Sequence, residues 1–204
     1  MSQEEFCESL LKNAPAFDIV LSESDATGLS GYYELVTKHN PLLHLVAPCT
    51  PADFAVRHVL ESLSLIRHLP QRTTFADAGT GAGLPSIPCL IVRPDLKGIL
   101  IENKERKTAF LREAVEQLGL AKRAAVAGRQ FEEVDISKAA AVTCRAIDKF
   151  TEKLPRMLRW AKGKRILLFG GNNLAEALSA DRVRFRSQLM PLSQQRFLFI
   201  VTGK

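Results

Sequence analysis

The spacing of apolar and polar residues changes once along the chain, near Thr73. Before this point, apolar residues recur at helical spacing in residues 3–13, 26–40 and 52–69. Thr50 followed by Pro51 is typical of a helix cap and first turn. The first part of the chain therefore predicts an N-terminal helical extension, which we assign to residues 1–70.

After Thr73, short apolar runs alternate with amphipathic segments. The apolar runs are residues 73–77, 98–102, 124–128, 139–144 and 164–170. Helical patterns lie near residues 85–92, 104–118, 130–137 and 148–161. Strands alternating with helices predict right-handed crossovers and a mostly parallel sheet that is covered on both faces. We assign this α/β domain to residues 71–204.

The last two apolar runs depart from this alternation. Residues 183–190 and 195–203 are separated by a short turn containing Pro and Ser, with no helix between them. They predict an antiparallel hairpin, with the C-terminal strand at the sheet edge.

Composition narrows the class of protein. No apolar run approaches the roughly 20 residues that a membrane helix needs, and the first ten residues are acidic where a signal peptide would be basic. The four cysteines show no metal-ligand or paired spacing, so we expect neither a metal site nor a disulfide framework. We expect a cytoplasmic protein without a membrane association.

Charge is unevenly distributed along the chain. Residues 1–70 contain 4 basic and 9 acidic side chains, whereas residues 145–204 contain 13 basic and 4 acidic ones. A basic segment of this kind favours a polyanionic partner such as a nucleic acid, although a solvated surface would have the same composition.

The sequence DAGTGAGLPSIP, from Asp77 to Pro88, follows the first predicted strand and opens a helix. Nucleotides bind at this position in open α/β sheets, and glycines let a ligand approach the backbone closely. The glycine spacing is G-x-G-x-G, with Leu84 where a dinucleotide-binding loop has its third glycine. A phosphate-binding P-loop is excluded because no Gly-Lys-Ser/Thr follows. S-adenosylmethionine, which carries no phosphate, fits this turn best.

Further residues are expected around the same cofactor. Asp77 is interpreted as facing the amino end of its methionine part, or alternatively as a helix N-terminal anion. Glu102, nineteen positions after Gly83, is interpreted as a ribose ligand, or as an ordinary capping carboxylate. After the third strand, a turn is expected at the adenine edge, although it could be a plain turn. The predicted cofactor-binding residues are Asp77, Gly79, Thr80, Gly81, Gly83, Leu84, Glu102, Asn103, Gly128, Arg129, Gln130 and Arg145.

These motifs together resemble one known family. The segments AVRHVLESL (55–63), DAGTGAGLPSIP (77–88), PDLKGILIENKERKTAFLREAVEQLGL (94–120), AGRQFEE (127–133) and TCRAI (143–147) are similar to the glucose-inhibited division protein B family. The family consists of bacterial enzymes that methylate guanine N7 in 16S ribosomal RNA. The similarity covers roughly residues 40–150.

The resemblance implies a fold, an activity and a partner. The fold is the Rossmann-like class I S-adenosylmethionine-dependent methyltransferase fold with an N-terminal helical extension. The implied substrate is 16S ribosomal RNA or the 30S particle, and the implied state is a monomer. Arg145 matches an arginine at the end of the fourth strand beside the target base, and we assign it the catalytic role of a base clamp. A surface ion pair with Asp148 is the alternative for this residue.

The sequence departs from the family at the end of the fifth strand. A Lys-Gly pair is usual there, whereas this chain has Phe169, Gly170 and Gly171. Two alternatives therefore stay open: a methyltransferase for a small molecule or a protein, and a catalytically silent RNA-binding relative.

Overall fold

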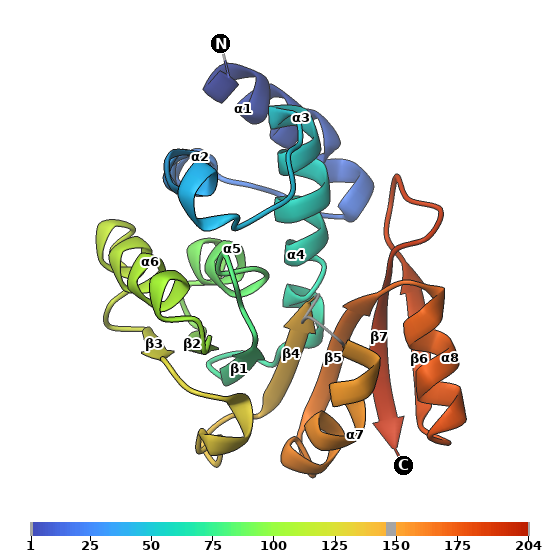
Figure 1. The fold of residues 1–204 in the computed structure, drawn as a ribbon. Helices are drawn as coiled ribbons and strands as arrows, with labels where there is room; N and C mark the ends of the chain where they lie inside the picture. The colour runs from blue at the N-terminus through green and yellow to red at the C-terminus, as the bar shows by residue number, and fades with distance from the viewer. Residues whose placement is uncertain (1, 146–149, 204) are drawn as a thin grey trace.

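A seven-stranded sheet forms the centre of the protein in the computed structural model, which describes residues 2–145 and 150–203 (Figure 1). Its strands are β1 (Thr74–Ala78), β2 (Lys97–Ile101), β3 (Ala124–Ala127), β4 (Ala141–Arg145), β5 (Arg165–Gly170), β6 (Arg184–Leu189) and β7 (Phe197–Gly203). The strand order is β3-β2-β1-β4-β5-β7-β6. Strands β1 to β5 are parallel, and β7 is antiparallel to both β5 and β6. The predicted mostly parallel sheet and C-terminal hairpin are thus confirmed. Strand β7 lies one position in from the edge, because β6 folds outside it.

Helices form the N-terminal part of the chain and the segments between strands, and the C-terminal end is the hairpin of β6 and β7. The helices are α1 (Ser2–Asn13), α2 (Glu23–Leu43), α3 (Pro51–Asp53), α4 (Glu61–Leu63), α5 (Ser86–Val92), α6 (Glu105–Gln117), α7 (Phe150–Trp160) and α8 (Asn172–Ala180). Short 3₁₀ turns lie at Ala14–Phe17, Ile66–His68 and Phe131–Glu133, and a π-helical segment, Phe54–Leu60, joins α3 to α4.

In two segments after Thr73, the helices of the structure differ from those predicted. The helix predicted over residues 130–137 is wrong, because only one 3₁₀ turn forms there. The backbone and hydroxyl of Ser137 both donate to the Asp135 carboxylate, and such local bonds compete with helix formation. Conversely, α8 is present where no helix was predicted, directly after Gly170 and Gly171.

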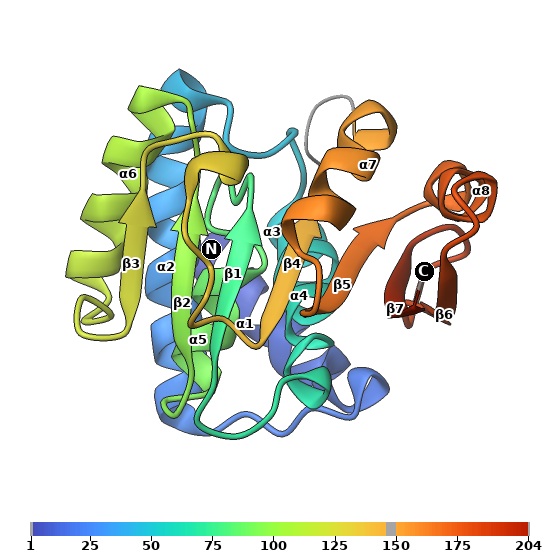
Figure 2. The ribbon, with the colours of Figure 1, turned by 90° about the horizontal axis from the view of Figure 1, so that it is seen from below.

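The two faces of the sheet carry separate apolar cores. Phe75, Leu100 and Leu167 pack with the N-terminal helices, α5 and α6. Their strand neighbours, such as Ala76 and Leu168, pack with α7 and α8 on the other face. Figure 2 shows the sheet between these two layers. Alternate residues of each strand therefore contribute to opposite cores.

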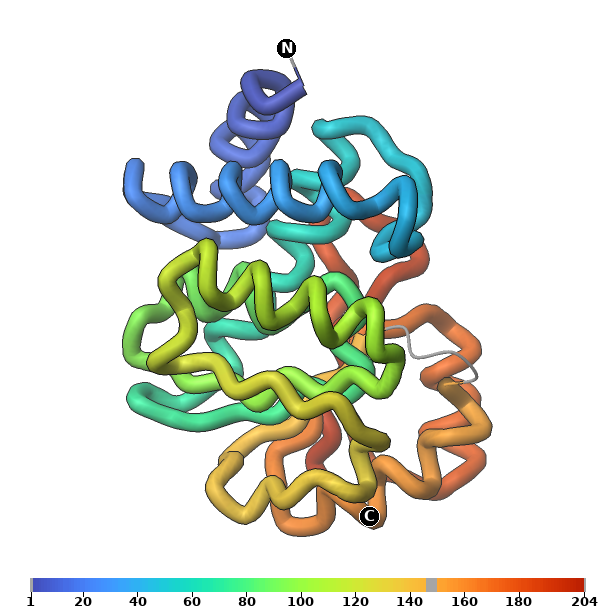
Figure 3. Tube along the Cα trace, turned by 60° about the vertical axis from the view of Figure 1, so that its left-hand side comes forward, coloured from blue at the N-terminus to red at the C-terminus, as the bar shows by residue number. Residues whose placement is uncertain are grey.

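The N-terminal helices belong to the first of these cores. Helix α2 contacts α5 and α6, and Figure 3 shows it running alongside α6. Phe6, Leu29 and Leu63 lie in one continuous apolar cluster with Phe75 of β1. The division at residue 70 stays a prediction, since the packing of these residues is shared.

Three further observations concern the described residues alone. No helix among them is both long and apolar enough to cross a membrane. Their four cysteines are all free thiols, and Cys49 is exposed. No cluster of three or more His, Cys, Asp or Glu side chains among them could hold a metal ion.

Candidate cofactor and substrate site

A cavity of about 370 Å³ opens at the carboxyl ends of the parallel strands. The strand order reverses between β1 and β4, because β2 and β3 lie on one side of this pair of parallel strands and β5 lies on the other, and ligands bind at such a switch point in open α/β sheets. The predicted residues that line the cavity are Gly79, Thr80, Gly81, Leu84, Glu102, Asn103, Arg129, Gln130 and Arg145. Asp77, Gly83 and Gly128 are not among its lining residues, and they lie behind it in supporting positions.

The glycine turn after β1 forms the floor of the cavity. The amides of Gly79 and Thr80 both donate to the carbonyl of Ile101, so the turn is tied to the end of β2. Gly83 has a φ of +90°, and a Cβ there would clash with the side chain of Ile87 at the start of α5. Only glycine fits this position, and its missing side chain lets the turn pack directly against the first turn of α5.

Asp77 is completely buried beneath the turn. Its Oδ2 accepts hydrogen bonds of 2.6 Å from the hydroxyls of Thr80 and Ser86, while its Oδ1 has no partner among the described residues. Burial raises the pKa of Asp77 to about 7, although the hydrogen bonds from Ser86 and Thr80 act to lower it. These contacts hold both ends of the turn together. The role of Asp77 toward the methionine part of the cofactor stays a prediction.

The titration of Asp77 predicts a pH dependence of stability. A carboxyl whose pKa is higher in the folded protein than its ordinary value of 3.8 binds a proton more tightly when folded. Its contribution therefore falls as pH rises from about 4 to about 7 and stays constant above that. Between pH 5 and pH 8 the free energy of unfolding of the wild type should fall by about 2–3 kcal/mol relative to that of Asp77→Asn. Denaturant titration at both pH values measures this difference, and parallel pH profiles would contradict it.

Glu102 lies at the end of β2 and is only 7% exposed. Its Oε2 accepts from the amide of Gly81 at 3.1 Å, and its Oε1 accepts from the amide of Lys104 at 2.9 Å. A carboxylate offers about four acceptor positions, so two remain for a ligand in the cavity. One side chain thus orients the glycine turn and presents an acceptor where ribose hydroxyls are expected.

The turn after β3 forms the opposite wall. Gly128 packs closely against Thr108, whose hydroxyl donates to the carbonyl of Glu102 at 2.9 Å. This contact leaves Arg129 and Gln130 on the cavity side. Phe131, which the sequence analysis did not select, also lines the cavity and supplies an apolar surface for an adenine ring.

The N-terminal helices reach the glycine turn through Tyr32 of α2. This side chain is fully buried, and its hydroxyl donates to the carbonyl of Ala82 at 2.9 Å. Ala82 lies between Gly81 and Gly83. A residue fifty positions away therefore supports the turn from behind, and no local sequence signal identifies it.

Tyr32→Phe should weaken cofactor binding while leaving the fold intact. It retains the ring and leaves the buried carbonyl of Ala82 without its donor, which costs about 1–2 kcal/mol. We expect the Kd for S-adenosylmethionine to rise roughly 3- to 10-fold, as measured by calorimetry. Tyr33→Phe is the matched control, because Tyr33 stacks on Phe6 away from the turn. Equal effects of the two substitutions would contradict the prediction.

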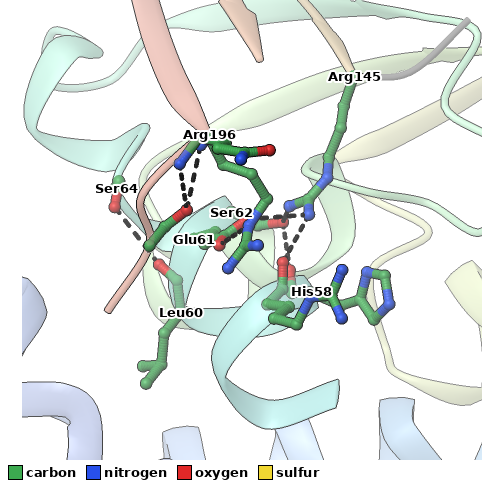
Figure 4. A network of polar contacts seen from close by, with 10 residues as sticks. His58, Leu60, Glu61, Ser62, Ser64, Arg145 and Arg196 are labelled. Atoms are coloured by element: carbon green, nitrogen blue, oxygen red, sulfur yellow. Dashed lines mark hydrogen bonds and ion pairs between the residues drawn. The ribbon is translucent and has the colours of Figure 1, made fainter. Parts of the chain in front are cut away.

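Arg145 projects from the end of β4 into the wall of the cavity. Its guanidinium donates to the hydroxyl of Ser62 at 3.1 Å, to the carbonyl of Arg57 and to the carboxylate of Glu61 at 3.2 Å (Figure 4). The alternative partner from the sequence analysis, Asp148, lies outside the described residues. Phe169, which stands in the place of the family lysine, lies beneath the guanidinium, with 5.5 Å between its ring centroid and Cζ of Arg145.

His58 is the main lining residue that sequence reasoning left out of the site. It belongs to the π-helical segment, and its ring Nδ1 is buried without a partner among the described residues. Burial, together with the charges of Arg145, Arg57 and Arg196, lowers the pKa of His58 to about 3. The ring is therefore neutral at pH 7. The remaining lining residues outside the prediction are Leu45, Val46, Ala47, Ala82, Ile101, Lys104, Lys107, Phe131 and Lys153.

The residues present fit S-adenosylmethionine. The floor is a glycine turn braced by a buried carboxyl, one wall offers the free acceptor positions of Glu102, and the other offers an apolar ring with polar neighbours. Four long basic side chains, Lys104, Lys107, Arg129 and Lys153, also line the cavity and would suit an anionic second substrate.

Comparison with known proteins finds a matching family and similar sequences. The model of the family described as rRNA small subunit methyltransferase G (GidB) matches residues 25–198. Ribosomal RNA small subunit methyltransferase G of Pelotomaculum thermopropionicum is 38% identical over 55% of this chain and 48% of its own length. The protein of that name from Neisseria meningitidis is 35% identical over 71% of this chain and 70% of its own length.

A solved structure shows the same fold. The M1A22 tRNA methyltransferase TrmK of B. subtilis superposes with a TM-score of 0.54 over 70% of this chain and 64% of its own, at 15% identity. At that identity the likeness concerns the fold alone. The chain spans about half the length of the Pelotomaculum protein and about 70% of the Neisseria one.

Proposed function

Because this chain belongs to the family described as rRNA small subunit methyltransferase G (GidB), we propose that it transfers a methyl group to guanine N7 of 16S ribosomal RNA. The methyl donor is S-adenosylmethionine, in keeping with the class I methyltransferase fold. The observation that carries the proposal is a single cavity that joins the glycine turn, Glu102 and Arg145. The first two suit the donor, and Arg145 suits a base.

The reaction makes few chemical demands on the side chains. When bound, S-adenosylmethionine supplies an electrophilic methyl group on a sulfonium. Guanine N7 carries an in-plane lone pair and no proton, so the protein needs no general base to activate it. His58 in the cavity wall has a pKa lowered to about 3 and is therefore a weak base, which is consistent with a reaction that removes no proton from N7. The protein's contribution is alignment, which can lower a barrier by roughly 7–11 kcal/mol.

Arg145 is proposed to hold the target base. A planar guanidinium can stack on a base or bond guanine O6 and a phosphate. The basic residues Lys104, Lys107, Arg129 and Lys153 would meet the flanking RNA phosphates at the cavity mouth. Asp77, Gly83 and Gly128 act from behind the cavity by shaping the turns that hold the donor.

The form of the RNA substrate, the oligomeric state and the location in the cell are also proposals. We propose that the protein acts as a monomer in the cytoplasm, on 16S RNA or on the 30S particle. The basic final third, residues 145–204, supports a large polyanionic substrate.

Cofactor titration followed by methyl transfer tests the function. Calorimetry with S-adenosylmethionine and its demethylated product should show one binding site. Labelled methyl groups should then appear on 16S RNA or on 30S particles, and mass mapping should locate them on guanine N7. Binding without transfer to either RNA would favour a small-molecule or protein methyltransferase, or a silent relative. Absence of cofactor binding would overturn the proposal entirely.

A further inference from the structure

Glu61 lies between two arginines that come from distant parts of the chain (Figure 4). Its side chain is 2% exposed, its Oε2 is 3.2 Å from Nη2 of Arg145, and its Oε1 is 2.5 Å from Nε of Arg196. Arg145 ends strand β4, and Arg196 lies in the loop between β6 and β7. Helix α4 thus joins the end of β4 to the C-terminal hairpin through one carboxylate.

Within the described part of the chain, the hydrogen bonds of the Arg145 guanidinium all lead to the same helical run. Besides Glu61, its guanidinium reaches the Ser62 hydroxyl and the Arg57 carbonyl. The π-helical segment contributes to this arrangement, since the amide of Glu61 donates to the carbonyl of Val56, five residues earlier. Widened turns of this type occur frequently at functional sites.

Stability alone is a weak reason for this arrangement. A buried ion pair gains little over a well-packed apolar contact, because both charges lose their hydration. However, an arginine that is fixed before the substrate arrives loses less conformational freedom on binding. The side chain of Arg145 is 14% exposed and lines the cavity, so its guanidinium is both held and accessible.

We propose that Glu61 is a positioning residue for methyl transfer, which fixes the guanidinium of Arg145 against the target guanine and is itself held by Arg196. The inference rests on the proposed function, because it assigns Glu61 its role through the base contact of Arg145. According to this proposal, the N-terminal helical run and the C-terminal hairpin together fix the position of Arg145, the residue that contacts the target base.

A double-mutant cycle tests the coupling. Glu61→Gln should lower kcat on 16S RNA or 30S particles about 10- to 30-fold, with the Kd for S-adenosylmethionine within about twofold of wild type. In an Arg145→Lys background, the same change should lower kcat less than about twofold, because its target is already lost. Glu61→Asp should restore part of the rate.

A matched control separates positioning from general damage. Glu113→Gln removes a carboxylate that also links two segments, through a 3.2 Å contact with His39, but outside this network. It should leave kcat unchanged. If Glu61→Gln does not fold, Arg196→Gln releases one side of Glu61 from an exposed loop and should lower kcat about 3- to 5-fold, again only when Arg145 is present.

A measurement that does not depend on turnover distinguishes the positioning role of Glu61 from the proposed methyl transfer. Side-chain nitrogen NMR should show slowly rotating Nη groups for Arg145 in the wild type and averaged signals in Glu61→Gln. Unchanged signals, wild-type kcat, or an equal loss in both backgrounds would each overturn the role of Glu61. Absence of transfer by the wild type, with ordered Arg145 signals that depend on Glu61, would overturn the proposed reaction instead.

Discussion

Arg145→Lys is expected to lower methyl transfer to 16S RNA about 100-fold while leaving S-adenosylmethionine binding within about threefold of wild type. Lysine keeps a positive charge beside Glu61, so the buried carboxylate is not left without a partner. It lacks the planar fork that lets arginine stack on a base and bond it with two donors. The loss should therefore appear in the transfer step, measured by single-turnover assays with labelled methyl groups.

Arg145→Ala makes a useful comparison with the lysine variant. It removes the charge and leaves Glu61 with Arg196 as its remaining ion-pair partner in the described structure, which typically costs about 3–5 kcal/mol of stability. The alanine variant should thus lose both turnover and thermal stability, whereas the lysine variant should lose turnover alone. Near wild-type transfer by Arg145→Lys would rule out a base clamp and leave only an ion-pairing role.

Glu102→Ala is expected to raise the Kd for S-adenosylmethionine about 100-fold or more. The substitution removes the acceptor of two backbone amides, those of Gly81 and Lys104, and removes the free acceptor positions that face the cavity. Hydrogen bonds to a carboxylate are worth about 1.5–3 kcal/mol each, so the glycine turn and the ribose contacts weaken together. Calorimetric titration measures the change directly.

Two companion variants refine the Glu102 prediction. Glu102→Gln keeps one acceptor oxygen and should show an intermediate Kd. Glu105→Ala changes an exposed carboxylate three residues further on, in the first turn of α6, and should leave the Kd unchanged. An unchanged Kd for Glu102→Ala would show that the carboxylate only caps the following backbone, which is the alternative that the sequence left open.

The sequence predicted those site residues that lie at the carboxyl ends of strands, because the parallel sheet fixes where these ends lie. Parallel strands bring their carboxyl ends to one edge, so Glu102 and Arg145 could be placed together with the glycine turn although they are 43 positions apart. Gly83 was predictable for a similar reason, because only glycine tolerates the conformation that this turn requires. The hairpin after Val183 followed from its short Pro-Ser turn.

The contributions of the N-terminal helices could not be predicted in the same way. Tyr32, His58 and Glu61 reach the site through tertiary packing, and each occupies an ordinary position in an amphipathic helix pattern. Helix α8 was missed because the two glycines before it are typical of a loop. Sequence periodicity reports which side of a helix is buried, but not which distant residue it meets.

The hydroxyl of Tyr32 beneath the glycine turn has a consequence for genetics. Because α2 shares its apolar core with β1, we expect heat or denaturant to melt both in one cooperative transition. A screen for lost ribosome modification should then recover substitutions throughout residues 29–36, where no side chain lines the cavity. Such alleles would be corrected by an increased supply of the methyl donor, since ligand binding favours the folded state.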